Sequence, residues 1–387
     1  MRLVILGAGH VAASVARILA ATGGYGEMVI ADLDLEKATE VAEEVGATAA
    51  QFDADDTPSI AAVITGADVV FNAVGPFYRF GLPIVRTAVE CRVDYVDVCD
   101  EFDTAAALIR DTDLDAAARA AGISVVFGMG YAPGITSLIA AWAVGTLDTA
   151  HSVDVAMAVP YTLKMGATIN EHMLHSMSGH VAQFLDGEIV DVPAWGDPRP
   201  FAFSAPFDTT VDMGYMGHPE GITIGTYLPG VRNATVRFAW FEPEANELWQ
   251  RYEKLGLTSA RADRRLPVPP RRYLAHFMDT PEGQRALAVE SAGMPGTAMQ
   301  IVAHGELDGE PARVTFETQV VYTGRGGQDP TPHAAAAAVR AMLEGTITRT
   351  GVMSPEACID PEPFVRSVLG PLGVRLTRQV AITSSLE

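Results

Sequence analysis

The chain has 387 residues, 48% of them hydrophobic, so it is long enough for two domains that each bury a core. Its formal net charge of −21 argues against nucleic acid or an anionic membrane as a partner. No apolar run approaches the roughly 18 residues of a membrane span, and the N-terminus lacks a signal peptide's basic start, so we expect a cytoplasmic protein. The three cysteines lack metal-ligand spacing, which suits a reducing compartment.

The first 32 residues predict a strand, a glycine turn, a helix and a second strand, which is the layout of a dinucleotide-binding βαβ unit. Gly7 permits the tight turn, Gly9 lets a pyrophosphate approach the backbone, and Ala12 lets the helix pack closely on the sheet. His10 and Val11 begin the helix, whose N-terminal N–H groups would bind the phosphates. The alternative, an ordinary glycine turn, fits this context less well.

Asp32 ends the second strand, about 20 residues past the glycine motif, where dinucleotide-binding proteins place an acid. Its carboxylate can accept hydrogen bonds from both ribose hydroxyls of NAD. Leu33 and Asp34 follow it, with no Arg to meet a 2′-phosphate. The sequence therefore favours NAD over NADP as the cofactor.

Strands and helices continue to alternate up to residue 127, which predicts a six-stranded doubly wound sheet and an α/β fold. The expected strands span residues 2–6, 28–31, 48–52, 68–72, 94–98 and 123–127. The expected helices span residues 35–45, a segment from about 58, 82–91 and 104–121.

Two features at strand ends of this domain are candidates for contact with the cofactor. Asp53 follows the third strand and could lie near the adenine, although capping the helix that begins near Pro58 is an equal alternative. Small residues and a Gly-Pro turn follow the fourth strand, where a cofactor crevice is expected because ligands bind outside the carboxyl ends of parallel strands. The residues of this second feature are Asn72, Ala73, Val74, Gly75 and Pro76.

After residue 131 the pattern changes to a helix at 135–144 and then a series of alternating runs. These runs predict an open, largely antiparallel sheet with helices on one face. The expected strands span residues 152–159, 188–192, 222–227, 235–241, 298–307 and 313–322. The expected helices span residues 244–255, 281–292, 332–344 and 361–369.

A series of short motifs keeps one order along nearly the whole chain. They include Gly7-Ala8-Gly9, Asn72-Ala73-Val74-Gly75-Pro76-Phe77, Val93-Asp94-Tyr95-Val96-Asp97 before Asp100-Glu101, Ala132-Pro133-Gly134, Thr168-Ile169-Asn170-Glu171, Asp186-Gly187-Glu188-Ile189-Val190-Asp191-Val192-Pro193, and Gly351-Val352-Met353-Ser354-Pro355-Glu356. In this order the motifs resemble those of the saccharopine dehydrogenase-like family, which includes lysine 6-dehydrogenases.

This resemblance implies a Rossmann dinucleotide-binding domain over residues 1–130 and an inserted α+β substrate and dimerisation domain over residues 131–328. Helices of residues 329–387 would pack back on the first domain. The resemblance also implies NAD(P)-linked oxidation or reduction of a carbon–nitrogen bond in an amino acid or amine, with the site in the interdomain cleft. The expected partners are a small-molecule substrate and a second copy of the chain.

Three titratable residues are candidates for moving the proton on the substrate nitrogen. Asp100 and Glu101 follow the fifth strand, and either could pair with an ammonium group or act as a base. Capping of the helix that starts near Thr104 is the alternative. His175 is a candidate because imidazole titrates near neutrality, although ordinary packing is the alternative.

A metal site is not expected around His172, His175 and His180. Apolar residues are interleaved with these histidines, Gly179 interrupts the helix, and no matching Cys or His pair is evident.

Six further residues are candidates for binding the substrate or lining the nicotinamide pocket. Arg79 could bind a carboxylate through two hydrogen bonds, although a surface salt bridge is nearly as good an interpretation. Lys164 could orient a carboxylate if buried, and otherwise it is an exposed loop residue. The remaining candidates are Phe77, Tyr78, Tyr131 and Thr136, with turn and cap chemistry as the alternative for the last two.

The leading hypothesis is an NAD-dependent amino acid or amine dehydrogenase. A reductase of another C=C or C=O substrate is the second hypothesis. A non-catalytic NAD-binding protein is the third, because the fold alone does not decide the chemistry.

Overall fold

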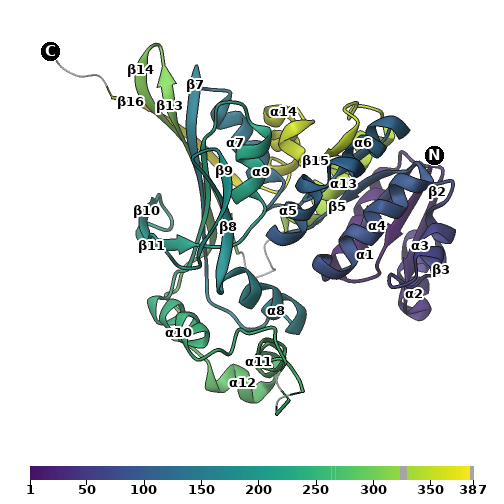
Figure 1. Cartoon of the computed structure of the whole chain (residues 1–387), viewed down its shortest axis with the longest axis horizontal. Helices are drawn as coiled ribbons and strands as arrows, with labels where there is room; N and C mark the ends of the chain where they lie inside the picture. Colours follow the sequence, from purple (N-terminus) through teal and green to yellow (C-terminus); the bar gives the residue numbers. More distant parts are fainter. Residues whose placement is uncertain (263, 266, 323–328, 384–387) are drawn as a thin grey trace. The chain divides into compact units, whose positions relative to one another are not determined.

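The computed structural model describes residues 1–262, 264–265, 267–322 and 329–383 and divides the chain into two compact units (Figure 1). Unit 1 comprises the described residues of Met1–Trp142 and Gln328–Leu372, and unit 2 those of Ala143–Gly327 and Gly373–Glu387. The sequence placed the first boundary at residue 130, whereas most of α7 (Ile135–Val144) belongs to unit 1. None of the helices in the described ranges is both long enough and apolar enough to cross a membrane.

Unit 1 contains a parallel sheet in the order β15-β6-β5-β4-β1-β2-β3. Its strands are β1 (Arg2–Leu6), β2 (Glu27–Asp32), β3 (Thr48–Gln51), β4 (Val69–Asn72), β5 (Asp94–Asp97), β6 (Ser124–Val126) and β15 (Gly351–Met353). The doubly wound prediction is confirmed, but the predicted count of six strands is wrong. The seventh, β15, comes from the distant C-terminal part and is only three residues long, too short to show a pattern.

The connections between these strands place helices on both faces of the sheet. The strand order reverses direction at β1, and since parallel crossovers are right-handed, helices of the two halves lie on opposite faces. Accordingly α1 packs against α2 and α13, whereas α4 packs against α3, α5 and α6. The helices are α1 (His10–Thr22), α2 (Leu35–Val45), α3 (Thr57–Ile64), α4 (Phe77–Cys91), α5 (Phe102–Arg110), α6 (Thr112–Ala121), α13 (Pro330–Leu343) and α14 (Pro361–Leu369), with a 3₁₀ turn at Pro355–Ala357.

The predicted single helix at 104–121 is wrong, because the structure divides it into α5 and α6 at Asp111. The Asp111 carboxylate accepts a hydrogen bond from the N–H of Leu114 at 3.0 Å and so caps α6. Aspartate is among the most favourable residues at such a cap, so it starts a new helix here.

Unit 2 contains a mixed, mostly antiparallel sheet, as predicted. Its main path is β10-β11-β12-β7-β13-β14-β16, and β8 pairs with β12 and β9. Only the β7–β12 pair within this sheet is parallel among the described strands. The strands are β7 (Thr149–Val159), β8 (His180–Leu185), β9 (Glu188–Pro193), β10 (Arg199–Phe203), β11 (Thr209–Tyr215), β12 (Asn233–Trp240), β13 (Gly296–Leu307), β14 (Glu310–Val321) and β16 (Arg375–Ile382).

The expectation that the whole C-terminal segment returns to the first domain needs correction. Helices α13 and α14 lie in unit 1, but β16 pairs antiparallel with β14 in the sheet of unit 2. The physical reason is that β14 would otherwise end the sheet with a long row of unpaired backbone groups, which β16 satisfies.

One predicted strand of unit 2 is a helix in the structure. Residues 222–227 were predicted as a strand but form α9 (Glu220–Tyr227), which packs on β8 and β12. The alternation of Ile and Thr in this short segment fits a strand, yet Ile222 and Ile224 are both fully buried in the helix. The predicted helix at 281–292 is shorter, as α12 (Pro281–Ala286). The others are α8 (Ala167–Ser176), α10 (Pro243–Lys254) and α11 (Pro270–Asp279).

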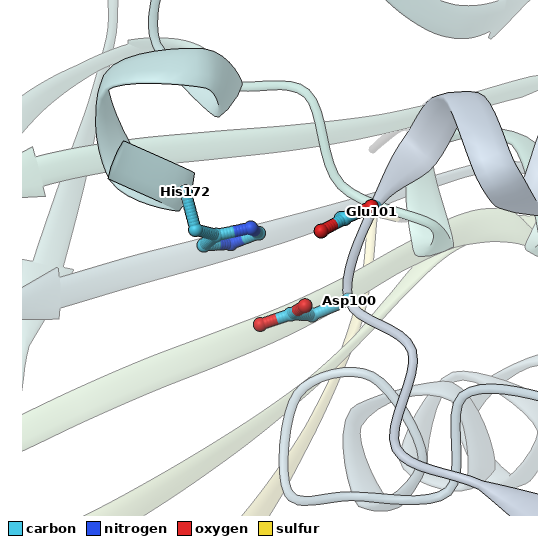
Figure 2. Close-up of side chains that lie close together, drawn as sticks. All are labelled: Asp100, Glu101 and His172. Atoms are coloured by element: carbon cyan, nitrogen blue, oxygen red, sulfur yellow. The ribbon is translucent and has the colours of Figure 1, made fainter. Parts of the chain in front are cut away.

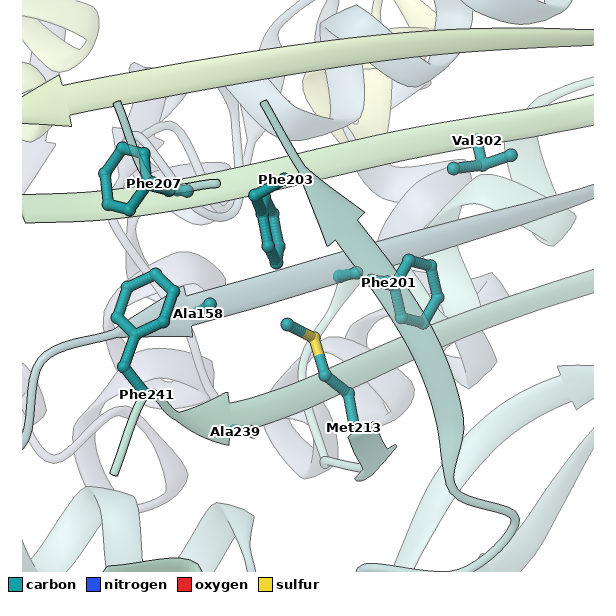
Figure 3. Close-up of a cluster of buried hydrophobic side chains, with 10 residues drawn as sticks. Ala158, Phe201, Phe203, Phe207, Met213, Ala239, Phe241 and Val302 are labelled. Atoms are coloured by element: carbon teal, nitrogen blue, oxygen red, sulfur yellow. The ribbon is translucent and has the colours of Figure 1, made fainter. Parts of the chain in front are cut away.

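A buried aromatic cluster fastens the β10–β11 hairpin to the sheet of unit 2 (Figure 3). Phe201 and Phe203 extend from β10, and Phe207 stacks on Phe241 with ring centroids 5.4 Å apart. Small side chains on the underlying strands, such as Ala158 and Ala239, leave room for these rings. Aromatic burial of this kind is a large part of the stabilisation of a sheet layer.

A buried hydrogen-bond chain fixes the carboxyl edge of the sheet in unit 1. Asn72 at the end of β4 donates to the hydroxyl of Tyr95, which donates to the carboxylate of Asp97 at the end of β5, each at 2.8 Å. The other carboxylate oxygen accepts from the N–H of Cys99 at 3.0 Å and of Gly128 at 2.8 Å. This chain therefore holds the segments that follow β4, β5 and β6.

Burial raises the pKa of Asp97 to about 6, although its three donors favour the charged form. An aspartate in the unfolded chain has a pKa of about 3.9. Since the folded state holds the proton more tightly, the contribution of Asp97 to stability is greatest below pH 4. That contribution falls as the pH rises to 6, by about 3 kcal/mol at most.

We therefore expect Asp97→Asn to lose the part of the pH dependence that Asp97 causes. The free energy of unfolding of the wild type, minus that of the variant, should fall between pH 4 and 6, as measured by urea unfolding at several pH values. Glu90→Gln, at an exposed acid of the same unit, is the comparison variant for the loss of one surface charge. If the free energies of unfolding of wild type and Asp97→Asn changed with pH in parallel, this account would be contradicted.

Candidate functional site

The glycine turn after β1 leaves open space beside the backbone. Gly7 has φ of 98°, a conformation that favours glycine, and a Cβ there would lie 3.4 Å from the carbonyl oxygen of Ala73. Gly9 has φ of −73°, and a Cβ there would meet no described atom within 4 Å. The chain's own packing therefore requires glycine at position 7 but not at position 9. The open space beside the backbone at Gly9 suits a ligand that approaches closely.

The turn lies at the topological switch point of the sheet, where β1 has β2 on one side and β4 on the other. Ligands of open α/β sheets bind outside the strand ends at this point. Gly9 is the N-cap of α1, and no acid occupies the first turn of this helix. The N-terminus of α1 thus presents N–H groups and a partial positive charge, as the pyrophosphate of a dinucleotide requires. The exposed His10 and half-buried Val11 form this first turn.

Asp32 is held beside the glycine turn by two backbone N–H groups. One carboxylate oxygen accepts from Ala8 at 2.7 Å and the other from Asp34 at 2.9 Å. Each carboxylate oxygen can accept a second hydrogen bond, so the oriented carboxylate can still receive the two hydroxyls of a ribose. The cofactor-binding role of Asp32 stays a prediction, which this geometry supports.

The segment after β4 lies next to the glycine turn. Ala73 donates its N–H to the carbonyl oxygen of Leu6 at 2.9 Å, and Val74 donates to the side chain of Asn72 at the same distance. Gly75 is exposed, and a Cβ there would meet nothing within 4 Å. Pro76 then precedes α4 as its N-cap. These mostly small residues lie beside the glycine turn.

The side chain of Glu101 caps α4, although Glu101 is itself the N-cap residue of α5, where its side chain makes no cap hydrogen bond. Its carboxylate accepts from the N–H groups of Phe77, at 3.2 Å, and Tyr78, and from the hydroxyl of Thr104 at 3.4 Å. Phe77 and Tyr78 therefore begin α4, five residues earlier than the sequence predicted. Burial and the charge of Asp100 raise the pKa of Glu101 to about 8, although the two backbone donors favour the charged form. Figure 2 shows these two acids on the segment before α5.

Arg79 and Asp53 are two other predicted site residues of unit 1. The contact of Arg79 matches its alternative interpretation, and the contacts of Asp53 match neither of its interpretations. Arg79 is exposed and pairs with both carboxylate oxygens of Asp55, the surface salt bridge that was its second interpretation. Asp53 accepts from the N–H of Asp55 at 2.9 Å in an exposed turn, whereas Asp56 is the N-cap of α3.

Tyr131 and Thr136 are both buried near the start of α7, where the N–H of Thr136 donates to the carbonyl oxygen of Tyr131 at 3.0 Å. This helix-turn contact fits their structural interpretation, and it leaves a role in the nicotinamide pocket as a prediction.

In unit 2, Lys164 is exposed, and its N–H donates to the hydroxyl of Thr162 at 3.1 Å. His175 lies on α8, where its Nδ1 is 3.0 Å from a guanidinium nitrogen of Arg271. Because guanidinium only donates, Nδ1 of His175 is the acceptor in this contact. His172, also drawn in Figure 2, lies on the same helix with its Nε2 3.4 Å from the hydroxyl of Ser176.

The sequence analysis did not single out His218 and Glu220, whose side chains are buried and hydrogen-bonded to each other in unit 2. Nor did it single out Asp97. The available signal for the pair was a carboxylate two residues after a histidine. Because residues 222–227 had been predicted as a strand, no helix start was expected there.

Comparisons with known proteins agree with this architecture. Residues 3–126 match the family model described as "Saccharopine dehydrogenase NADP binding domain". Over 105 residues, or 26% of this chain, the sequence is 31% identical to two proteins of Mycobacterium tuberculosis, from strains H37Rv and CDC 1551, that are named as candidate trans-acting enoyl reductases. The matched segment spans only 25% of the length of each of these relatives.

A solved structure of similar fold extends the likeness to the whole chain. Saccharopine dehydrogenase (L-Glu forming) from Saccharomyces cerevisiae aligns over 98% of this chain and 99% of its own, with a TM-score of 0.67 and 16% sequence identity. Residues 3–126 are therefore similar to the saccharopine dehydrogenase NADP-binding domain, and the chain as a whole has the fold of saccharopine dehydrogenase.

Proposed function

We propose that this chain is an NAD-dependent oxidoreductase that acts on a carbon–nitrogen bond of an amino acid or amine. The observation that carries the proposal is the cradle of unit 1, formed by the open backbone at Gly9, the N-terminus of α1 and the oriented carboxylate of Asp32. These groups fit the pyrophosphate and a ribose of a dinucleotide, whose nicotinamide supplies hydride transfer. The family match and the saccharopine dehydrogenase fold support the C–N bond as the reacting group.

The preference for NAD over NADP rests on charge near Asp32. A 2′-phosphate would face this carboxylate, whereas ribose hydroxyls can donate to it. The cations of the neighbouring segments have acidic partners: Lys37 lies 3.5 Å from Asp34, and Arg17 pairs with Glu44 at 2.7 Å. The matched family is described as NADP-binding, so this chain would differ from that description through Asp32.

The protein's tasks in such a reaction are to hold the substrate carbon, bind its charged groups and move a proton on or off nitrogen. The predicted proton-transfer candidates were Asp100, Glu101 and His175. Glu101 is the least suited of these because its carboxylate already receives two helix N–H groups. A small-molecule substrate and homodimer formation remain part of the proposal.

The second candidate function is reduction of a C=C or C=O bond. It is favoured by the 31% identity to the two mycobacterial proteins named as candidate enoyl reductases. The same cradle would bind the cofactor, so the two functions differ in the substrate that reacts. A non-catalytic NAD-binding role is the outcome if neither substrate class reacts.

Reduction of NAD at 340 nm against a panel of amino acids and polyamines, from neutral to alkaline pH, tests the proposal directly. We expect a signal with lysine or a related diamino acid. Oxidation of NADH by enoyl thioesters, with silence on every amine and on keto acid–amine mixtures, would replace the proposal by the second candidate. Binding of NADH without turnover of either class would leave a binding protein.

Gly9→Ala should weaken NADH binding at least about tenfold, because the added methyl occupies the space that the pyrophosphate needs. The φ of −73° is allowed for alanine and no described atom lies within 4 Å, so the thermal midpoint of the apo protein should not fall. Fluorescence titration and a melting curve measure the two effects. An unchanged NADH dissociation constant would remove the cradle from the cofactor assignment.

Asp32→Asn should lower the ratio of NAD to NADP affinity by about tenfold or more, since a hydrogen bond to a charged group contributes about 1.5–3 kcal/mol. Titration of both nucleotides against wild type and variant gives this ratio. Glu36→Gln, at an exposed acid of the first turn of α2, is the matched control and should keep the wild-type ratio. Tighter binding of NADP than of NAD by the wild type would contradict the cofactor preference.

A further inference from the structure

Unit 2 contains a pocket between the end of β10 and the strands β13, β14 and β16. Its volume is about 250 Å³, whereas one molecule of liquid water takes up roughly 30 Å³. Among the lining residues, Phe203, Gln300 and Glu317 are buried, and the exposed Ala202 and Gln379 form the mouth. The pocket therefore reaches from the surface to a buried carboxylate, and it has room for a small organic molecule.

Strand pairing brings the polar residues of this pocket to one face of the sheet. In the antiparallel register, Glu317 of β14 lies opposite Gln300 of β13 and Thr377 of β16. Thr315 of β14 lies opposite Gln379 of β16, two residues along each strand and so on the same face. The strand period of two residues therefore builds a polar patch beside the end of β10.

The carboxylate of Glu317 is contacted by neutral donors. Oε1 accepts from the hydroxyl of Ser204 at 2.6 Å and from the amide of Gln319, and Oε2 accepts from the amide of Gln300 at 2.7 Å. The N–H of Ser204 is shared between the two oxygens at 3.2 and 3.3 Å. All of these groups donate, as an ionised carboxylate requires, and Oε2 is the oxygen with fewer close donors.

Within the described ranges, no cation forms an ion pair with Glu317. Arg313 of β14 and Arg375 of β16 lie on the same face of the sheet, but Arg375 donates to the carbonyl oxygen of Ala205 at 2.6 Å. Glu317 is only 5% exposed, and a buried charge that has left water needs a partner of opposite charge. A tether for the end of β10 explains the contacts with Ser204, but it does not explain a charge beside an open pocket.

A metal ion fits this pocket less well than an organic cation. Ca²⁺ and Mg²⁺ take roughly six to eight oxygen ligands, and Glu317 is the one acid among the described residues that line the pocket. A volume of about 250 Å³ would leave a single ion without close ligands on most sides. The size and the donor set therefore favour an ammonium group that carries a carbon chain.

We propose that this pocket binds a primary alkylammonium ion, with its positive charge against Oε2 of Glu317. A primary ammonium donates three hydrogen bonds, and the hydroxyls of Thr315 and Thr377 can accept the two that Glu317 does not take. Phe203 and Ala202 offer apolar surface to a short alkyl chain. The proposal does not depend on the proposed function, because all these residues lie in unit 2 and neither cofactor nor reaction is involved.

The first test locates binding by NMR in the full chain without cofactor. Threonine methyl groups are labelled with ¹³C, and the signals of Thr315 and Thr377 are assigned by their loss in Thr315→Val and Thr377→Val. We expect n-butylammonium chloride at pH 7 to shift both signals with a saturable dependence on its concentration. The signal of Thr57, an exposed threonine of unit 1 assigned in the same way, should stay in place.

Two additives that each lack one part of the probe are the controls. 1-Butanol has the carbon chain without the charge, and KCl supplies a cation without the chain, so neither should shift the two signals. Equal shifts with either additive, or no saturable shift with n-butylammonium, would overturn the proposal.

The second test removes the charge. Glu317→Gln should weaken n-butylammonium binding at least about tenfold, because a hydrogen bond to a charged group is lost. Glu310→Gln, at an exposed glutamate of the same strand, is the matched control and should bind as the wild type does. An unchanged dissociation constant in Glu317→Gln would remove the carboxylate from the site and with it the proposal.

Variants at the mouth of the pocket test the sign of the charge, and they decide if Glu317→Gln does not fold. Gln379 is exposed, so its replacement keeps the hydrogen bonds of Glu317 in place. Gln379→Lys should weaken n-butylammonium binding about two- to fivefold, and Gln379→Glu should strengthen it by a similar factor. No change, or changes in the same direction, would overturn the proposal. A wild type that oxidises no amine would refute the proposed function alone, because these titrations measure only binding.

Discussion

The buried carboxylate of Asp97 is the constraint on which the carboxyl edge of the sheet in unit 1 depends. Backbone N–H groups that emerge from the ends of parallel strands have left the sheet ladder and need other acceptors. Asp97 supplies one for Cys99 and one for Gly128, and through Tyr95 it orients Asn72, which in turn accepts from Val74. One buried acid thus fixes three successive loops, at the cost of the raised pKa that burial imposes on it.

Two helix N-termini at this edge are treated in opposite ways. The N-terminus of α4 receives the carboxylate of Glu101, so its positive partial charge is already balanced. The N-terminus of α1 has glycine as N-cap and no acid in its first turn. In a chain with a net charge of −21, a helix N-terminus without an acid attracts an anion. The N-terminus of α1 is such an end, and it lies beside the glycine turn.

Sequence patterns succeeded where the physics is local. The turn at Gly7, the helix start at Gly9 and the acid at the end of β2 follow from neighbouring residues, and the structure has these elements at the expected places. The strand β16 was not predicted, because its stability comes from pairing with β14, some 60 residues away. The prediction for the α9 segment was wrong for another reason. Ile-Thr-Ile fits both the helical and the strand period, and only packing on β8 and β12 selects the helix.

The same distinction explains which candidate site residues changed their meaning. Arg79 was predicted from its side-chain type and its place just past the Gly-Pro turn, and its partner Asp55 became visible only in the structure, where α4 begins at Phe77. The pairing of His218 with Glu220 depends on a helix start at Pro219, which the strand assignment had hidden.

A further consequence concerns how a proton can be moved without damage to the fold. Glu101 and Asp97 accept hydrogen bonds from backbone N–H groups that hold α4 and the loops after β5 and β6. Acids that already serve as structural acceptors in this way are therefore poorly suited to exchange protons with a substrate.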